Sequence, residues 1–484
     1  MLKRNILYNT ILQLSQLLFP LITFPYAARV LMPSAMGSVS FASNFTQYFL
    51  TFAFLGIPAY GIREIAKVKG NHILLKKTFS ELFYFNLITT TLVSIIFLCI
   101  VTTITILKSD LTLFLIGFGI IWSNLFFIEW YYNGTQDFKY ITIRSLIIRS
   151  LSVILIFTLI KSPKDKNLYY LIEFIVIFLS SILNFSKAKN LLIYNINEIN
   201  LKRHITPVLT LFSLSVMVTI YVYANTIILG LFKPKYEVAY YSVSERISKL
   251  AIAFIKTAGI VLIPELSILL NKKEENKQSR ALDLLKKSFY YTTFLSIPIA
   301  FGVLFFSKEL IEIIAGKSYK LADYSLMILS PLPILLGLAF IYSRQILFPL
   351  GKEKQMFRLS IYGMLFNLTI NFILIPKFGY IGSSISYLLT EILMMTLVYF
   401  ESRKYIRLNI KMKEPLMNCL LSIPFFFIHY MISRFTQNSY LILPLGILIC
   451  AIFYVTIQLL LLKNKIALEI YNYILPINHK KTQR

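Results

Sequence analysis

One stretch in the middle of the chain carries charged residues at intervals that place them on one side of a helix. Glu245, Arg246, Lys249 and Lys256 fall within an arc of about 100°, because each residue advances a helix by about 100°. Ser242 lies in the same arc. Three cations against one anion give this side a net positive charge, and the cations can hold the anionic group of a ligand through charge-assisted hydrogen bonds. The spacing therefore predicts an anion-binding helix face.

The apolar surroundings of these residues restrict where such a face can lie. Residues 238–268 form an expected membrane span, and a charged side chain near the bilayer centre costs about 2.5–3.5 kcal/mol. A face that lines a water-filled cavity avoids this cost. The alternative is that the helix begins later, so that Glu245 and Arg246 lie at the membrane surface and Lys249 extends toward water. That alternative leaves Lys256 unexplained.

The first apolar stretch, residues 8–31, also has features that a simple membrane anchor lacks. It contains Pro20 and Pro25, and each proline removes a backbone donor from the helix. Backbone carbonyls freed in this way are tolerated at membrane depth only where protein or a cavity satisfies them. Arg29 near the end of the stretch must also pair, reach the interface or face a cavity. This helix is therefore expected to line a cavity.

The composition is that of a membrane protein with many spans. Of the 484 residues, 57% are hydrophobic and 15% charged, and the mean hydropathy is +0.69. The formal net charge is +27, but the lysines and arginines lie mostly in short loops between apolar segments. This distribution follows the positive-inside rule, so we expect no nucleic-acid partner. The three cysteines and four histidines have no metal-ligand spacing.

The apolar segments predict an all-α fold of about 14 transmembrane helices. If the N-terminus is cytoplasmic, the inside segments hold about three times as many lysines and arginines as the outside loops. An even number of spans then places both termini in the cytoplasm. The expected spans are 8–31, 38–60, 81–107, 110–130, 140–160, 168–186, 206–232, 238–268, 285–306, 322–346, 356–376, 381–401, 415–433 and 440–462.

The order of these spans suggests two related halves. Interrupted helices begin each half, and such pairs indicate a transporter repeat with a site between two lobes. We expect an N-lobe of six spans at 1–190, a cytoplasmic linker at 191–204 and a C-lobe of six spans at 205–405. Residues 406–484 would form two extra helices and a cytoplasmic tail. The short connections and the lack of a phosphate-binding loop argue against an ATPase, a membrane glycosyltransferase or a polymerase.

Several short motifs occur in order from residue 8 to about 400, and the ordered set is more specific than any one motif. The residues that form these motifs are Pro25, Tyr26, Arg29, Leu31, Gly37, Gly61, Arg63, Glu64, Glu129, Trp130, Gly134, Tyr221, Leu229, Gly230, Tyr240, Tyr241, Ser242, Asn367, Asn371, Pro376, Gly379 and Gly382. This set resembles the Wzx-type polysaccharide flippases of the multidrug/oligosaccharidyl-lipid/polysaccharide exporter superfamily.

This resemblance implies a two-lobed, MATE-like fold with a central cavity in the bacterial inner membrane. It implies a flippase, not an enzyme, that moves oligosaccharide repeat units on undecaprenyl pyrophosphate to the periplasmic leaflet by alternating access. O-antigen or capsule assembly would use these units, with membrane lipids, a polymerase and a chain-length regulator as possible partners. No cofactor is implied, although a proton or sodium gradient is a possible driving force.

We expect the anionic headgroup to bind a cationic cavity, and other polar residues to serve in gating or coupling. Asn225 stands where the family commonly has Asp, so no ion role is transferred to it. Two alternatives stay open: a flippase for lipid II-type peptidoglycan precursors and a MATE-like multidrug exporter. The cavity candidates are Arg29, Arg246, Lys249 and Lys256; the gating or coupling candidates are Arg63, Glu129, Glu245, Asn225, Asn367 and Asn371.

Overall fold

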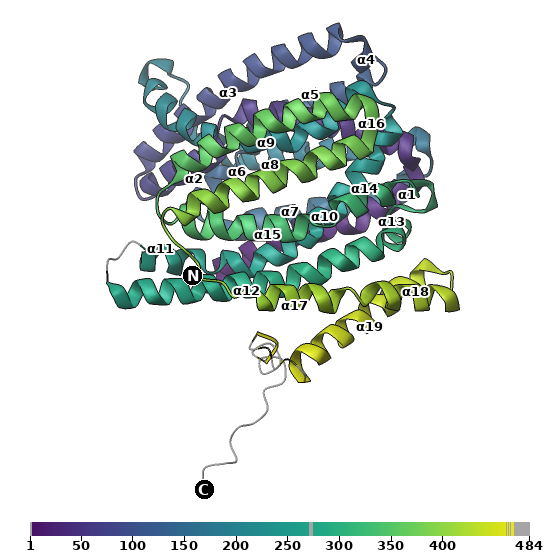
Figure 1. Ribbon diagram of the computed structural model, residues 1–484. Coiled ribbons are helices and arrows are strands. Elements are labelled where there is room, and N and C mark those ends of the chain that lie inside the picture. The colour runs from purple at the N-terminus through teal and green to yellow at the C-terminus, as the bar shows by residue number, and fades with distance from the viewer. Residues whose placement is uncertain (1, 271–273, 461, 463, 465, 469–484) are drawn as a thin grey trace. The chain divides into compact units, whose positions relative to one another are not determined.

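The computed structural model describes residues 2–270, 274–460, 462, 464 and 466–468, and these residues form helices and connecting segments without β-strands. The expected all-α architecture is therefore confirmed (Figure 1). Residues 469–484, most of the expected cytoplasmic tail, lie outside the described residues.

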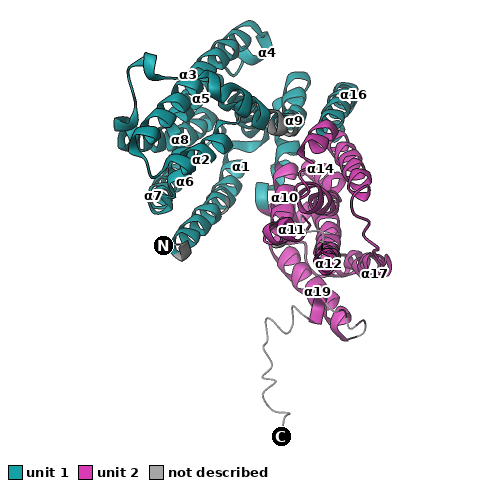
Figure 2. Cartoon of the chain, turned by 90° about the vertical axis from the view of Figure 1, so that its left-hand side faces the viewer, with its two compact units in different colours: residues 1–242, 314–319, 360–383 teal, residues 243–313, 320–359, 384–484 magenta. Residues whose placement is uncertain are grey.

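The chain divides into two compact units, coloured separately in Figure 2. Unit 1 comprises residues 1–242, 314–319 and 360–383. Its sequence-continuous part holds α1 (Leu2–Phe54), α2 (Ile57–Val68), α3 (His72–Thr103), α4 (Thr105–Lys108), α5 (Leu111–Phe127), α6 (Glu129–Thr135), α7 (Phe138–Leu159), η1 (Pro163–Asp165), α8 (Lys166–Ala188), η2 (Lys189–Leu191), η3 (Ile196–Glu198) and α9 (Lys202–Phe232).

Unit 2 comprises residues 243–313, 320–359 and 384–484, and two long helices, α10 and α16, contribute to both units. The segment η5 is a π-helix. From α10 onward the elements are α10 (Lys235–Ile260), α11 (Ile263–Leu270), α12 (Glu275–Phe305), α13 (Ser307–Ala315), η4 (Lys317–Tyr319), α14 (Ala322–Leu329), α15 (Leu332–Phe340), η5 (Ile341–Leu347), α16 (Glu353–Arg403), α17 (Lys413–Ser422), α18 (Phe425–Phe435) and α19 (Ser439–Leu460).

Ten helices in the described part of the chain are long and apolar enough to cross a membrane. This supports a multi-pass membrane protein, whereas the count of fourteen spans stays a prediction. Single residues with non-helical backbone angles interrupt α1 at Met32 and α16 at Gly379. Both interruptions fall at expected boundaries between spans. The predicted division into lobes at residues 190 and 205 also stays a prediction.

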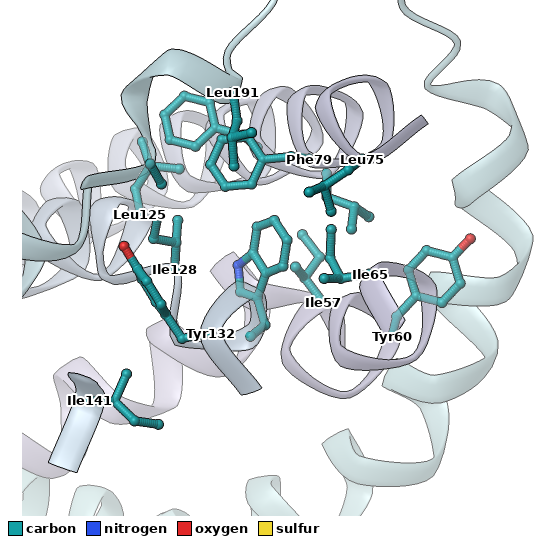
Figure 3. Packing of buried hydrophobic residues seen from close by; sticks show 14 of the residues in the cluster. Ile57, Tyr60, Ile65, Leu75, Phe79, Leu125, Ile128, Tyr132, Ile141 and Leu191 are labelled. Carbon is teal, nitrogen blue, oxygen red and sulfur yellow. The ribbon is translucent and has the colours of Figure 1, made fainter. Parts of the chain in front are cut away.

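Close contacts between short helices explain several residues of the ordered motifs in unit 1. A Cβ atom on Gly61 of α2 would lie 2.8 Å from Cε3 of Trp130 in α6. A Cβ atom on Gly134 would likewise lie 2.7 Å from Cγ2 of Ile65. Ile65 belongs to the hydrophobic cluster drawn in Figure 3, together with Phe79 of α3. At both positions a side chain would overlap a residue of the neighbouring helix. Glycine therefore allows α2 and α6 to pack this closely.

Unit 2 has two hydrophobic clusters of its own. One lies around Leu285 and Phe289 of α12 and Ile341 and Ile346 of η5. The other joins α12 to the last helices through Phe294, Phe425, Cys450 and Tyr454. Since α17–α19 bury apolar side chains against α12, the two C-terminal spans are packed parts of unit 2.

Gly37 in α1 is the tightest of the glycine contacts and allows a direct test of this packing. A Cβ atom there would lie 1.7 Å from the backbone oxygen of Lys235 and 3.3 Å from the backbone nitrogen of Ala239. We expect Gly37→Ala to lower the free energy of unfolding by about 1–3 kcal/mol, because backbone atoms cannot move aside as a side-chain end can. Equilibrium unfolding in mixed micelles measures this change.

Gly302 in α12 is the matched control, since among the described residues no atom outside its own stretch of helix lies within 4 Å of a Cβ atom built on it. Gly302→Ala is expected to be neutral or to stabilise the protein by about 0.5–1 kcal/mol, because alanine favours a helix over glycine. Equal behaviour of the two variants would contradict the close approach at Gly37.

Candidate functional site

The predicted cationic residues belong to both units. Arg29 lies on α1 in unit 1, and Arg246, Lys249 and Lys256 lie on the part of α10 that belongs to unit 2. The Arg29 side chain is exposed, and its Cγ atom would lie 3.1 Å from a Cβ atom on Gly316. Gly316 has a φ of +93°, so it both forms the turn before η4 and leaves room for the arginine stem.

The charged face of α10 forms within one continuous helix. That helix begins at Lys235, well before Glu245, so all four charged residues lie on one helix, and the position of the membrane surface along it stays a prediction. Lys249 Nζ lies 2.8 Å from Glu245 Oε1; the Glu245 side chain is largely buried, and that of Lys249 is 46% exposed. The pair satisfies the buried carboxylate and leaves part of the lysine accessible to solvent.

Lys256 lies half-buried about two turns beyond Lys249 on α10, and Arg246 is also half-buried. The charge that acts favourably on Lys256 is that of Glu391 in the second half of α16, a residue that is 3% exposed. A buried carboxylate requires such compensation, because an isolated charge is poorly solvated in a protein interior. Glu391 therefore supplies a countercharge to the end of the cationic face.

The three predicted asparagines come together in unit 1. Asn371 donates to Asn225 Oδ1 at 2.5 Å and to Asn367 Oδ1 at 2.8 Å, and Asn367 donates to Asn225 Oδ1 at 3.2 Å. Asn225 in turn donates to the hydroxyl of Tyr241 at 3.0 Å. All three amides are fully buried. This cluster links α9, α10 and α16 through neutral groups, and its predicted role in gating or coupling stays a prediction.

Arg63 and Glu129, the other gating candidates, do not pair with each other. Arg63 is 53% exposed, contacts Glu64 Oε1 at 3.1 Å and lies over the Tyr60 ring at 5.3 Å from its centroid. An exposed pair of this kind contributes little to stability. Glu129 begins α6, and its Oε1 lies 3.4 Å from a guanidinium nitrogen of Arg144 on α7.

Arg144 is a buried charged residue that lies outside the ordered motifs. It is 5% exposed, donates to Asn184 Oδ1 of α8 and to Ser145 Oγ, and lies over the Phe127 ring. The one arginine thus joins α5, α6, α7 and α8. The signal available in the sequence was a charged residue inside the expected span 140–160.

A second buried network surrounds Glu81, which is fully buried near the start of α3. Its carboxylate accepts hydrogen bonds from the Arg203 guanidinium and, at 3.0 Å, from the Asn200 backbone. His204 Nε2 lies 3.0 Å from the same carboxylate, while His204 Nδ1 lies 2.8 Å from the Tyr60 hydroxyl. These contacts fasten the start of α9 to α2 and α3. In the sequence, this network was indicated only by an acidic residue at the edge of the expected span 81–107.

Comparisons with known proteins agree with this architecture. Residues 2–270 match the family described as "Polysaccharide biosynthesis protein". A relative from Shigella dysenteriae, "Putative O-antigen transporter", is 26% identical over 397 residues, which cover 81% of this chain and 98% of the relative.

Two solved structures share the fold. "Lipid II flippase MurJ, inward closed conformation" covers 98% of this chain and 100% of its own, with a TM-score of 0.59 and 17% identity. An inward-facing multidrug resistance MATE family transporter of the MOP superfamily covers 83% of this chain and 97% of its own, with a TM-score of 0.63 and 15% identity. These two similarities confirm the expected MATE-like helical fold.

Proposed function

Because this chain belongs to the polysaccharide biosynthesis protein family, we propose that it is a flippase for lipid-linked oligosaccharide repeat units. The observation that carries the proposal is the match to a relative named as an O-antigen transporter, which extends over 98% of that relative. The substrate would be a repeat unit on undecaprenyl pyrophosphate. It would move from the cytoplasmic to the periplasmic leaflet of the inner membrane by alternating access, for O-antigen or capsule assembly.

The cationic residues Arg29, Arg246, Lys249 and Lys256 would hold the pyrophosphate. Arginine presents a planar set of donors that matches phosphate oxygens, and lysine supplies a compact point charge. Lys249 contacts Glu245 at 2.8 Å in this structure, so substrate binding would replace a carboxylate oxygen by a phosphate oxygen. Headgroup binding would then be coupled to the release of the Glu245 carboxylate from Lys249.

Gating would use polar groups that connect helices, together with Glu245 on α10. Arg63 is exposed and can change partners at little cost, and Glu129 is held by Arg144. The asparagine cluster consists of amides and the Tyr241 hydroxyl, and its proposed part in gating is to hold α9, α10 and α16 together. A polymerase and a chain-length regulator are the proposed partners, and both termini are proposed to be cytoplasmic.

The three cations on α10 also bear on the alternatives. An exporter of cationic drugs needs an acidic cavity, since like charges would repel its substrate. The substrate of a lipid II-type flippase has the same anionic headgroup. The cations on α10 therefore do not distinguish that function from the proposed one. The sugar attached to the lipid distinguishes these two substrates.

Deletion of the gene in the parent bacterium tests the proposal. We expect loss of surface polysaccharide and accumulation of complete lipid-linked repeat units on the cytoplasmic face, both reversed by the wild-type gene. Accumulation on the periplasmic face would indicate a polymerase, and truncated units a glycosyltransferase. Accumulated peptidoglycan precursor would instead indicate a lipid II-type flippase. Normal polysaccharide in a strain without a second transporter of this family would contradict the proposal.

A further inference from the structure

A pocket of about 520 Å³ lies within unit 2, apart from the cationic face of α10. Apolar and aromatic side chains form part of its wall: Phe289 of α12, Tyr342 of η5, and Met395 and Tyr399 of α16. The Tyr342 and Tyr399 rings meet edge to face, with centroids 5.2 Å apart. Residues 406–410, in the segment that joins α16 to α17, complete the wall. The volume is within the range of about 300–1,000 Å³ that is typical of small-molecule sites.

The joining segment is held in place by its own side chains. Ile406, Leu408 and Ile410 alternate along it and pack against the hydrophobic cluster around Leu285 and Ile341. Beyond them, the Lys411 backbone N–H donates to the Tyr290 hydroxyl at 2.8 Å. Residues 406–410 all line the pocket, so this segment forms a continuous part of its wall. The pocket therefore has a defined wall.

Among the described residues that line this pocket, two are arginines and none is acidic. Arg403 ends α16 and Arg407 lies in the joining segment, and both are exposed. The Arg403 guanidinium lies 5.6 Å from the centroid of the Tyr399 ring. The nearby Glu401 carboxylate contacts Lys404 at 2.6 Å. Within the described part of the chain, neither arginine forms an ion pair with a carboxylate, so both can bind an external anion.

We propose that this pocket binds a phosphate ester, with Arg403 and Arg407 on the phosphate and the aromatic wall against an apolar part of the ligand. Paired guanidinium groups match phosphate oxygens in geometry and charge. The ends of α16 and η5 are expected at the cytoplasmic surface, where cationic segments attract anionic lipids. The phosphate could belong to the headgroup of such a lipid or to a soluble metabolite. This inference does not depend on the proposed flippase function.

Native mass spectrometry of the delipidated full-length protein tests the site. Phosphatidylglycerol, phosphatidylcholine and glycerol 3-phosphate are titrated separately. We expect one phosphatidylglycerol to bind more tightly than phosphatidylcholine, and Arg403→Gln/Arg407→Gln to weaken this binding at least about tenfold, since hydrogen bonds to charged groups are strong. Displacement of the lipid by glycerol 3-phosphate would assign the phosphate to a soluble ligand. Lack of displacement would assign it to the lipid headgroup.

Two further variants separate the pocket from general surface charge. Lys354→Gln/Arg358→Gln removes the same charge from two exposed residues of α16 outside the pocket and is expected to bind phosphatidylglycerol as the wild type does. Met395→Trp keeps both arginines and is expected to weaken binding by filling the pocket. The proposal is overturned if the arginine variant binds as tightly as the lysine–arginine control, or if Met395→Trp, shown to be folded by its unfolding temperature, has no effect.

Discussion

Replacing Arg29, Arg246, Lys249 and Lys256 together by glutamine is expected to stop transport of lipid-linked repeat units. Each charge-assisted hydrogen bond to an anion contributes about 1.5–3 kcal/mol, and about 1.4 kcal/mol corresponds to a tenfold change, so surface polysaccharide should fall at least about tenfold. The variant is expressed in the deletion strain. Surface polysaccharide and the complete repeat units left on the cytoplasmic face are both measured, since a transport defect lowers the first and raises the second.

The control for this experiment removes four other cations. Lys139, Lys202, Lys354 and Arg358 have exposed side chains, and replacing them by glutamine changes the net charge by the same amount. This control is expected to restore the polysaccharide of the deletion strain. If the first quadruple variant were present in the membrane at wild-type level and also restored it, the four residues would not form the headgroup site. A single Lys249→Gln variant would measure separately the effect on transport of removing the lysine that pairs with Glu245.

Replacing Arg144 by methionine is expected to lower the free energy of unfolding by about 3 kcal/mol. The change removes a charged hydrogen-bond donor from two acceptors. Asn184 is fully buried, and the side chain of Glu129 is 25% exposed. Removing one partner of a buried pair is costly because the other keeps its desolvation penalty, about 3–5 kcal/mol for fully buried pairs. The partial exposure of Glu129 places the expected value at the lower end. Equilibrium unfolding in mixed micelles measures the change.

Two companion variants identify the cause of this loss. Arg149 lies on the same helix and acts on Glu129 only through its charge, so Arg149→Met is expected to have a much smaller effect. Adding Glu129→Gln to Arg144→Met should recover part of the lost stability, because the unpaired carboxylate is then removed. A double variant less stable than Arg144→Met alone would show that Glu129 has another partner more important than Arg144.

Periodic features of the sequence predicted the helices well. The boundary expected between the spans 8–31 and 38–60 coincides with the backbone break at Met32, and the boundary after 356–376 with the break at Gly379. The charged face of α10 also follows from spacing alone, because residues seven apart return to the same side of a helix. Such inferences succeed since they depend on neighbours within a few turns.

Contacts between distant helices had no comparable signal. Glu81 and His204 are 123 positions apart, and the partner of Glu129 is Arg144, which is not one of the motif residues. The partner of a charged residue in a span depends on how each helix is rotated about its axis, and neighbouring helices set that rotation. The three asparagines were candidates for gating or coupling, but the hydrogen bond from Asn371 on α16 to Asn225 on α9 was not expected.

By itself, the sequence of this protein determined that it is a helical membrane protein with a cationic face on one helix and the ordered motifs of a polysaccharide flippase. Apolar length, charge distribution and helical spacing are local properties of the chain, so they can be read without coordinates. Tertiary structure alone decided that Arg144 and Glu81 are buried in hydrogen-bonded networks, that Gly61 makes room for Trp130, and that two arginines line a pocket near α17. These features arise from packing between helices, which helical periodicity does not encode.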